Sequence, residues 1–188
     1  MDTTKGNKNP KSSLYFLTRT AILTAVLCVL APLAIPIGPV PVSLATLVIY
    51  FSLYLCGWKM GTVSVVVYLM IGMMGLPVFS AFSGGVGKLV GPTGGYIIGY
   101  IPMAVLSGLI ISRYQNKPVQ FLGLAAGTAL CYAFGTAWFC YVTSTSLGAA
   151  LAACVLPFIP GDLVKIVIAM CFGPMIRKKL VKAGLLQS

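Results

Sequence analysis

The sequence predicts an all-α integral membrane protein, a bundle of six transmembrane helices with both termini in the cytoplasm. Of its 188 residues, 59% are apolar and only 8% are charged. In a soluble domain about a quarter of the residues carry a charge. The mean hydropathy is +0.99. A chain of this composition exposes hydrocarbon over most of its surface, so the lipid bilayer is its first expected partner.

Six stretches are long and apolar enough to be considered as spans, since a bilayer core about 30 Å thick needs roughly 20 apolar residues in a helix. They are residues 14–36, 42–56, 60–76, 93–111, 119–143 and 160–180. Only residues 57–59 separate the short second and third spans, which predicts a tight helical hairpin. Residues 146–157 are too short to cross, and we interpret them as a partial or re-entrant helix. The chain, residues 1–188, then forms a single membrane domain that begins with a cytoplasmic tail, residues 1–13.

The distribution of basic residues supports this number of spans and orients the bundle. With six spans, eleven of the thirteen lysines and arginines lie on the side of the two termini, and only Lys88 and Lys165 lie on the other. Cytoplasmic loops carry an excess of basic residues, which places both termini in the cytoplasm and the protein in the cell membrane. The net charge of +11 thus reflects orientation and contact with anionic lipid, and no nucleic-acid partner is expected.

The same composition excludes most catalytic and metal sites. The chain has no histidine and only two acidic residues, Asp2 and Asp162, so it lacks a histidine-based catalytic pair, an imidazole metal site and a plausible pair of catalytic carboxylates. We therefore expect no metal and no cofactor, and we do not expect an enzyme. The enzymatic alternative is a Ser83–Lys88 pair, but no further base or oxyanion donor accompanies it.

Two segments on the outer side of this topology are candidate parts of a binding site. Residues 35–41 contain three prolines within six residues, which predicts either a rigid turn or a gate over an outward-facing pocket. Residues 75–96 are rich in glycine and uncharged apart from Lys88. Such backbone is tolerated in a membrane only where it is buried in protein or lines a wet cavity, so a binding loop and a flexible surface loop are the two interpretations. The candidate contacts in this segment are Ser83, Gly84, Gly85, Gly91, Thr93, Gly94, Gly95 and Tyr96.

Asp162 and Lys165 form the third candidate feature. They are spaced i, i+3, so both project from one face of the last predicted helix and can reach each other. Ionisable residues inside a membrane are costly and usually mark a functional site. The alternative interpretation makes Asp162 a helix N-cap that Lys165 merely neutralises. As a functional pair, the two side chains predict a pocket for a small, mostly apolar ligand with one polar head.

Three motifs together resemble the BioY family, the biotin-binding S components of energy-coupling factor (ECF) vitamin transporters. They are GLPVF at residues 75–79, SGGVGKLVGPTGGY at 83–96 and GDLVK at 161–165, and the proline-rich IPIGPVPV turn and the six-span layout accompany them. The resemblance covers essentially the whole chain. It departs from the family pattern at Ser83, where some relatives have Asn, and at Ala45, where many have Gln.

The resemblance implies high-affinity biotin binding from outside and ATP-driven uptake, with biotin as the transported ligand. The family docks on a membrane subunit, the T component, which a pair of cytosolic ATPases powers. Small residues on the first helix contact the T component in the family, which matches Ala21 and Ala25. The carboxylate and lysine of GDxxK contact the polar head of the vitamin, which matches Asp162 and Lys165. The glycine-rich loop lines the site.

The chemistry of biotin agrees with these side chains. The ureido ring offers two N–H donors to Asp162 and one carbonyl acceptor to Lys165, and charge-assisted hydrogen bonds are the stronger kind. The valerate carboxylate could meet loop amides of residues 83–95 or Lys88. Two alternatives stay open: an S component for a different vitamin, and a proton-coupled secondary carrier in which Asp162 carries the proton.

Overall fold

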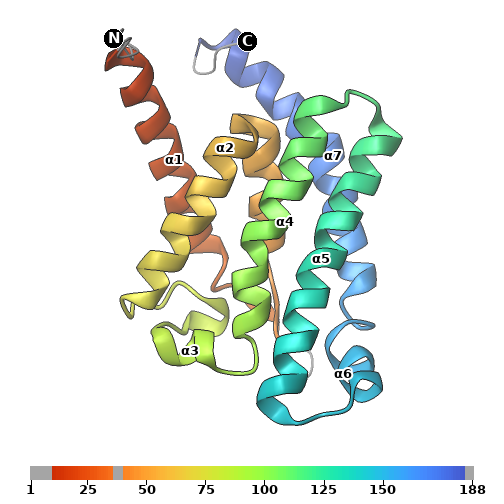
Figure 1. Cartoon of the computed structure of the whole chain (residues 1–188). Helices are drawn as coiled ribbons and strands as arrows, with labels where there is room; N and C mark the ends of the chain where they lie inside the picture. Colours follow the sequence, from red (N-terminus) through yellow and green to blue (C-terminus); the bar gives the residue numbers. More distant parts are fainter. Residues whose placement is uncertain (1–9, 36–39, 185–188) are drawn as a thin grey trace, which may run out of the picture.

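The computed structural model describes residues 10–35 and 40–184, and within them it consists of helices joined by short connections (Figure 1). The helices are α1 (Pro10–Leu30), α2 (Ala45–Met73), α3 (Val86–Val90), α4 (Gly94–Arg113), α5 (Lys117–Thr143), α6 (Leu147–Cys154) and α7 (Ile159–Lys182), with a 3-10 turn at Ser80–Phe82. The strands β1 (Ala34–Ile35) and β2 (Val42–Ser43) pair in antiparallel register. The protein is therefore all-α, as the composition predicts.

Four of these helices, α2, α4, α5 and α7, are long and apolar enough to cross a membrane. The apolar part of α1, Leu14–Leu30, is shorter. Helix α1 begins and α7 ends at the same end of the bundle, whereas α3 and α6 lie at the opposite end (Figure 1). The two ends thus differ in character, and the short helices cover only one of them.

Helix α2 reverses direction at Gly57. This residue has φ 80° and ψ 174°, a backbone conformation that side-chain-bearing residues rarely adopt. A Cβ atom on Gly61 would lie 3.5 Å from the backbone nitrogen of Leu53, a contact that a straight helix does not allow over eight residues. The two halves of α2 therefore pack side by side, in agreement with the hairpin predicted around residues 57–59.

The helix ends differ from the predicted spans around the proline-rich turn. Helix α1 stops at Leu30 and α2 starts at Ala45, so residues 34–35 and 42–43, which lie in the predicted segments 14–36 and 42–56, form strands and not helix. Prolines at positions 32, 36, 39 and 41 explain the difference, because proline lacks the N–H that a helix interior needs and disfavours helical geometry in the residue before it. Residues 36–39 of the predicted gate lie outside the described residues.

The remaining boundaries shift by a few residues. Helix α2 ends at Met73, before Gly75, whose φ of 100° is incompatible with a continuing helix. Helix α1 already begins at Pro10, inside the segment predicted as a tail. Helix α6 occupies the segment 146–157 that was too short to span, and α7 starts one residue before the predicted 160.

Glycines let α4 and α5 approach closely. A Cβ on Gly127 would lie 2.0 Å from the Oγ atom of Ser107, and one on Gly135 would lie 2.2 Å from the ring of Tyr96. Small residues at helix contacts are typical of membrane bundles, where packing and not the hydrophobic effect holds the helices together. This close packing fixes the start of α4 against α5, where one wall of the site described below is formed.

Candidate ligand-binding site

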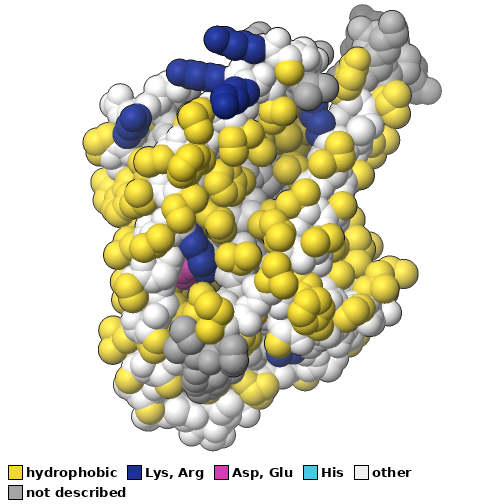
Figure 2. Space-filling view, turned by 180° about the vertical axis from the view of Figure 1, so that it is seen from behind, with side chains coloured by type: hydrophobic (Ala, Val, Ile, Leu, Met, Phe, Trp, Pro, Cys, Tyr) yellow, Lys and Arg dark blue, Asp and Glu magenta, His cyan; other side chains and the backbone are white. Residues whose placement is uncertain are grey.

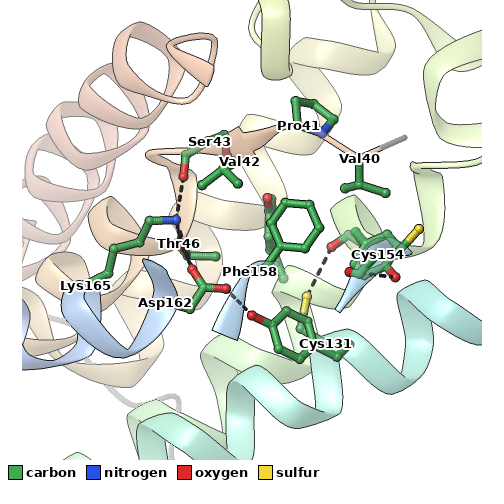
Figure 3. A pocket seen from close by; sticks show the side chains of 13 residues that line it. Val40, Pro41, Val42, Ser43, Thr46, Cys131, Cys154, Phe158, Asp162 and Lys165 are labelled. Atoms are coloured by element: carbon green, nitrogen blue, oxygen red, sulfur yellow. Dashed lines mark hydrogen bonds and ion pairs between the residues drawn. The ribbon is translucent and has the colours of Figure 1, made fainter. Parts of the chain in front are cut away.

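A pocket with an empty volume of about 410 Å³ opens where β2, the starts of α2, α4 and α7, and the middle of α5 converge (Figure 3). It is lined by Val40, Pro41, Val42, Ser43, Thr46, Tyr96, Tyr100, Cys131, Tyr132, Cys154, Phe158, Asp162 and Lys165. Aromatic and aliphatic side chains dominate the lining, and the charged groups are confined to α7.

Asp162 and Lys165 lie together in this pocket, as their spacing predicts. The Nζ atom of Lys165 is 2.9 Å from Oδ1 of Asp162, and the two residues are 9% and 7% exposed. The N-cap of α7 is Phe158, and no side chain hydrogen-bonds to the helix start, so the interpretation of Asp162 as an N-cap is wrong. The pair is instead a buried ion pair whose charges cancel.

The polar contacts of the pair extend to three other elements. Lys165 Nζ donates to the backbone carbonyl of Ser43 at 2.8 Å and to Oγ1 of Thr46 at 3.1 Å. Thr46 in turn donates to Asp162 Oδ1 at 3.3 Å, and the Tyr132 hydroxyl donates to Asp162 Oδ2. Each hydrogen of the ammonium group therefore has an acceptor, which is what a buried charge requires.

The opposite wall of the pocket is aromatic and mostly apolar. The Tyr96 hydroxyl is 3.0 Å from Oγ1 of Thr136, a hydrogen bond that holds the ring in place. Tyr100, one turn further along α4, and Phe158, just before α7, add two more rings. A ligand that combines a hydrogen-bonding head with a hydrocarbon or thioether body can place the head on the ion pair and the body against these rings.

Apart from Tyr96, the glycine-rich segment of residues 75–96 does not line this pocket. Of the sequence-predicted contacts, the structure brings Asp162, Lys165 and Tyr96 together in it. It places the other seven outside the lining: Ser83, Gly84, Gly85, Gly91 and Thr93 in the connection between α2 and α4, and Gly94 and Gly95 at the start of α4. The Ser83 hydroxyl donates to the carbonyl of Ser80 at 2.7 Å, and Gly91 accepts from the Trp138 indole at 3.0 Å. Ligand contacts from these seven residues stay a prediction.

Close packing accounts for several of these glycines. A Cβ atom on Gly94 would lie 1.6 Å from the carbonyl oxygen of Leu89, and one on Gly84 would lie 2.2 Å from that of Leu76. A Cβ on Gly95 would meet Trp138 Cβ at 2.3 Å. No side chain fits at these positions, so the glycine density of the loop has a structural cause that does not depend on a ligand.

The arrangement offers hydrogen bonds and charge, but no reactive constellation. Within residues 10–35 and 40–184, no three His, Cys, Asp or Glu side chains gather where they could hold a metal ion. Ser83 and Lys88, the pair considered for an enzyme, lie outside the pocket lining. The site is suited to binding a ligand without changing it chemically.

The profile of the BioY family matches residues 5–182, nearly the whole chain. The chain belongs to the BioY family. It is 36% identical over 162 residues to the biotin transporter BioY of Thermotoga maritima, an alignment that covers 86% of this chain and 95% of the relative. It is 33% identical over 164 residues to the biotin transporter BioY2 of Lactococcus lactis, covering 86% and 90% of the two chains.

A solved structure supports the same assignment. The chain is similar, with a TM-score of 0.81 and 32% identity, to the crystal structure of the S-component for biotin from an ECF-type ABC transporter. The alignment covers 91% of this chain and 94% of the other. This BioY-family chain is therefore a multi-pass protein of the cell membrane in a family of transporters and not of enzymes.

Sequence reasoning missed several lining residues of this BioY-family site. Ser43, Thr46 and Tyr132 contact the ion pair, yet they lie 30 to 122 residues from their partners on α7. A threonine at the start of a helix and a tyrosine in an apolar span carry no local signal for a site. Only the predicted gate, residues 35–41, pointed toward this region: its last residues, Val40 and Pro41, line the pocket.

The small residues of α1 are available for contact with another protein. Ala21 and Ala25 are both exposed, on a face of α1 that also exposes Ile22 and Val26. Thr24, on the opposite face, is buried against α2 and donates to the carbonyl of Ser64 at 3.4 Å. One side of α1 therefore packs on the bundle, and the side with the alanines does not.

Proposed function

We propose that this chain is the biotin-binding S component of an ECF-type ABC transporter. The observation that carries the proposal is the buried Asp162–Lys165 pair at the polar end of an aromatic pocket, in a chain of the BioY family. Membership of the family supports biotin as the substrate. The ion pair supplies the hydrogen-bond acceptor and donor that the ureido ring of biotin needs.

The polar head of biotin meets the ion pair in this proposal. Asp162 accepts from a ureido N–H group. Its Oδ2 atom accepts from Tyr132 and, with two lone pairs, accepts one further hydrogen bond. Lys165 donates to the ureido carbonyl in place of one of its protein acceptors, Ser43 or Thr46. The bicyclic body then packs against Tyr96, whose ring is already held by Thr136.

The carboxylate of the valerate chain is assigned to the region of the glycine-rich loop. The amides of residues 83–95 and the side chain of Lys88 are the available partners there, with Ser83, Gly84 and Gly85 at its start and Gly91, Thr93, Gly94 and Gly95 at its end. Biotin is the transported ligand, and the proposal includes no cofactor or metal.

The chain crosses the membrane six times in this proposal, with both termini in the cytoplasm. The reversal of α2 at Gly57 supports two crossings by that helix, and α1 begins and α7 ends at the same end of the bundle (Figure 1). A membrane-impermeant maleimide applied to intact cells tests the orientation. We expect a Lys88→Cys variant to be labelled from outside and a Lys117→Cys variant only after the membrane is opened. The reverse pattern would overturn the topology.

The proposed partners are an ECF T component and a pair of cytosolic ATPases. The exposed Ala21 and Ala25 supply the contact with the T component, because small residues let the backbones of two membrane helices approach closely. Energy for uptake comes from the ATPases, since the chain itself carries no nucleotide-binding motif.

Calorimetric titration of the detergent-purified chain with biotin, thiamine and riboflavin tests the ligand. We expect one-to-one binding of biotin and no heat from the other two vitamins. If a folded sample bound another vitamin instead, the chain would be an S component for that vitamin and not for biotin. Biotin uptake that a protonophore abolishes and that proceeds without an ATPase module would favour the proton-coupled carrier instead.

A further inference from the structure

A second pocket lies at the opposite end of α7 from the Asp162–Lys165 pair. It has an empty volume of about 1290 Å³ and lies between the last turns of α7, the middle of α2 and the connection from α4 to α5. It is lined by Tyr54, Ile111, Gln115, Gln120, Pro174, Met175, Arg177, Lys178, Lys179, Val181 and Lys182. Four of the thirteen basic residues of the chain therefore surround one concave surface.

No acidic side chain in the described residues balances these cations. Asp162 is the one acid among residues 10–35 and 40–184, and it is already paired with Lys165. It lies roughly 24 Å from Lys178 along the axis of α7, several times the distance over which salt screens a charge. Most of the basic side chains visible in Figure 2 lie at one end of the molecule, with another beside the acidic side chain at mid-height and one near the opposite end. The neutralising anion must therefore come from outside the described chain.

The floor of the pocket is polar and internally hydrogen-bonded. The side-chain oxygen of Gln120 accepts from the Tyr54 hydroxyl at 3.2 Å, and its amide nitrogen donates to the carbonyl of Tyr114 at 2.8 Å. Gln120 is only 9% exposed. These bonds tie α2, α5 and the α4–α5 connection together beneath the cations, so the floor of the pocket consists of buried groups that are already hydrogen-bonded.

The edge of the pocket is apolar and partly exposed. Met175 lines it and is 44% exposed, and Phe172, about one turn earlier on α7, is 49% exposed. Ile111 and Val181 add further hydrocarbon to the lining. An anion that carries hydrocarbon chains matches both parts of this surface, whereas a free anion would leave the apolar edge unused.

The geometry points to a binding site for the headgroup of an anionic phospholipid, with its phosphate among the α7 cations and its acyl chains along the apolar edge. Basic pockets between membrane helices are suited to such headgroups, and the planar guanidinium of Arg177 suits two phosphate oxygens at once. The ligand is a structural lipid, and it is separate from the proposed vitamin site at the start of α7.

Native mass spectrometry of the detergent-purified chain tests this site with phosphatidylglycerol and phosphatidylcholine of identical acyl chains. Because detergent exposes both ends of the protein, the result does not depend on the proposed orientation. We expect the wild-type chain to bind phosphatidylglycerol at least about tenfold more tightly than phosphatidylcholine. Equal binding of the two lipids would overturn the inference.

Two matched triple variants locate the binding. In the first, Lys178, Lys179 and Lys182 are replaced by Gln, and we expect a loss of at least about tenfold in phosphatidylglycerol affinity. In the second, Lys59, Arg113 and Lys117, which do not line this pocket, are replaced by Gln, and the affinity should stay within about twofold. An equal loss in both variants, or none in the first, would show that bulk charge or a different surface is responsible.

Two further measurements keep the test decisive if the first variant folds poorly. Replacement of the same three lysines by Arg preserves the charge and should preserve the preference for phosphatidylglycerol. In the wild-type chain, the preference should fall as the salt concentration rises. Biotin titration of each variant reports folding independently, since the vitamin pocket shares no residue with this one.

Discussion

The ammonium group of Lys165 on α7 donates a 2.8 Å hydrogen bond to the backbone carbonyl of Ser43, 122 residues earlier in the chain. Ser43 belongs to β2, which pairs with β1 on the other side of the proline-rich turn. The same Nζ atom is bound to Asp162. The ion pair therefore also anchors the strand that borders the pocket, so a ligand that takes a hydrogen bond from Lys165 acts on the position of that strand.

Replacing Asp162 by Asn should weaken biotin binding by about 1.5–3 kcal/mol, the range for a hydrogen bond to a charged group. The substitution keeps the shape of the side chain but removes the negative charge of the group that accepts from a ureido N–H. Calorimetric titration of the folded variant measures the loss. Asp2→Asn, at the other acidic residue of the chain, is the matched control and should bind biotin as the wild type does. An unchanged affinity in Asp162→Asn would leave Asp162 as a structural partner of Lys165 only.

Replacing Lys165 alone should lower the stability of the protein more than replacing both Asp162 and Lys165. Lys165→Met leaves the buried carboxylate of Asp162 without its counter-ion, a loss of about 3–5 kcal/mol for a buried pair. The double variant with Asp162→Asn removes that unpaired charge, so its thermal stability should recover while biotin binding stays lost. Thermal unfolding and biotin titration of the two single variants and of the double variant complete this double-mutant cycle. A double variant as unstable as Lys165→Met would contradict the account of the pair.

Adding a methyl group at Gly94 should destabilise the protein by about 1–3 kcal/mol, the usual effect of overpacking. The new Cβ would lie 1.6 Å from the carbonyl oxygen of Leu89, and this backbone atom has no rotamer by which to move away. Gly87→Ala is the control, because nothing lies within 4 Å of a Cβ there. The melting temperature in detergent checks the difference. Equal melting temperatures would show that the α3–α4 connection is looser than the structure describes.

Enlarging the small residues of α1 should weaken assembly with the T component and leave biotin binding intact. Ala21→Leu with Ala25→Leu fills the exposed face at which the partner helix is proposed to pack. Ala126→Leu with Ala133→Leu, at exposed alanines of α5, is the matched control. Co-purification with the T component and the ATPases measures assembly, and titration measures biotin binding. A loss of assembly in both double variants would point to a general effect of bulk on the membrane surface.

The glycine-rich loop shows where sequence reasoning about the site reached its limit. Glycine in this segment predicts either a ligand approaching the backbone or another part of the chain doing so. The carbonyl of Leu89 beside Gly94 and the side chain of Trp138 beside Gly95 are contacts of the second kind. A sequence does not distinguish these two causes, because in both cases the observation is the same: a glycine, which has no side chain.

The sequence by itself determined the membrane class, the helical content and the pairing of Asp162 with Lys165. Composition decides the solvent that a chain prefers, and an i, i+3 spacing on a helix brings two side chains together through local geometry. Only the tertiary structure decided that Ser43, Thr46 and Tyr132 complete the polar cluster. These contacts join helices that are distant in the chain, and their existence depends on how α2, α5 and α7 pack, which no local pattern encodes.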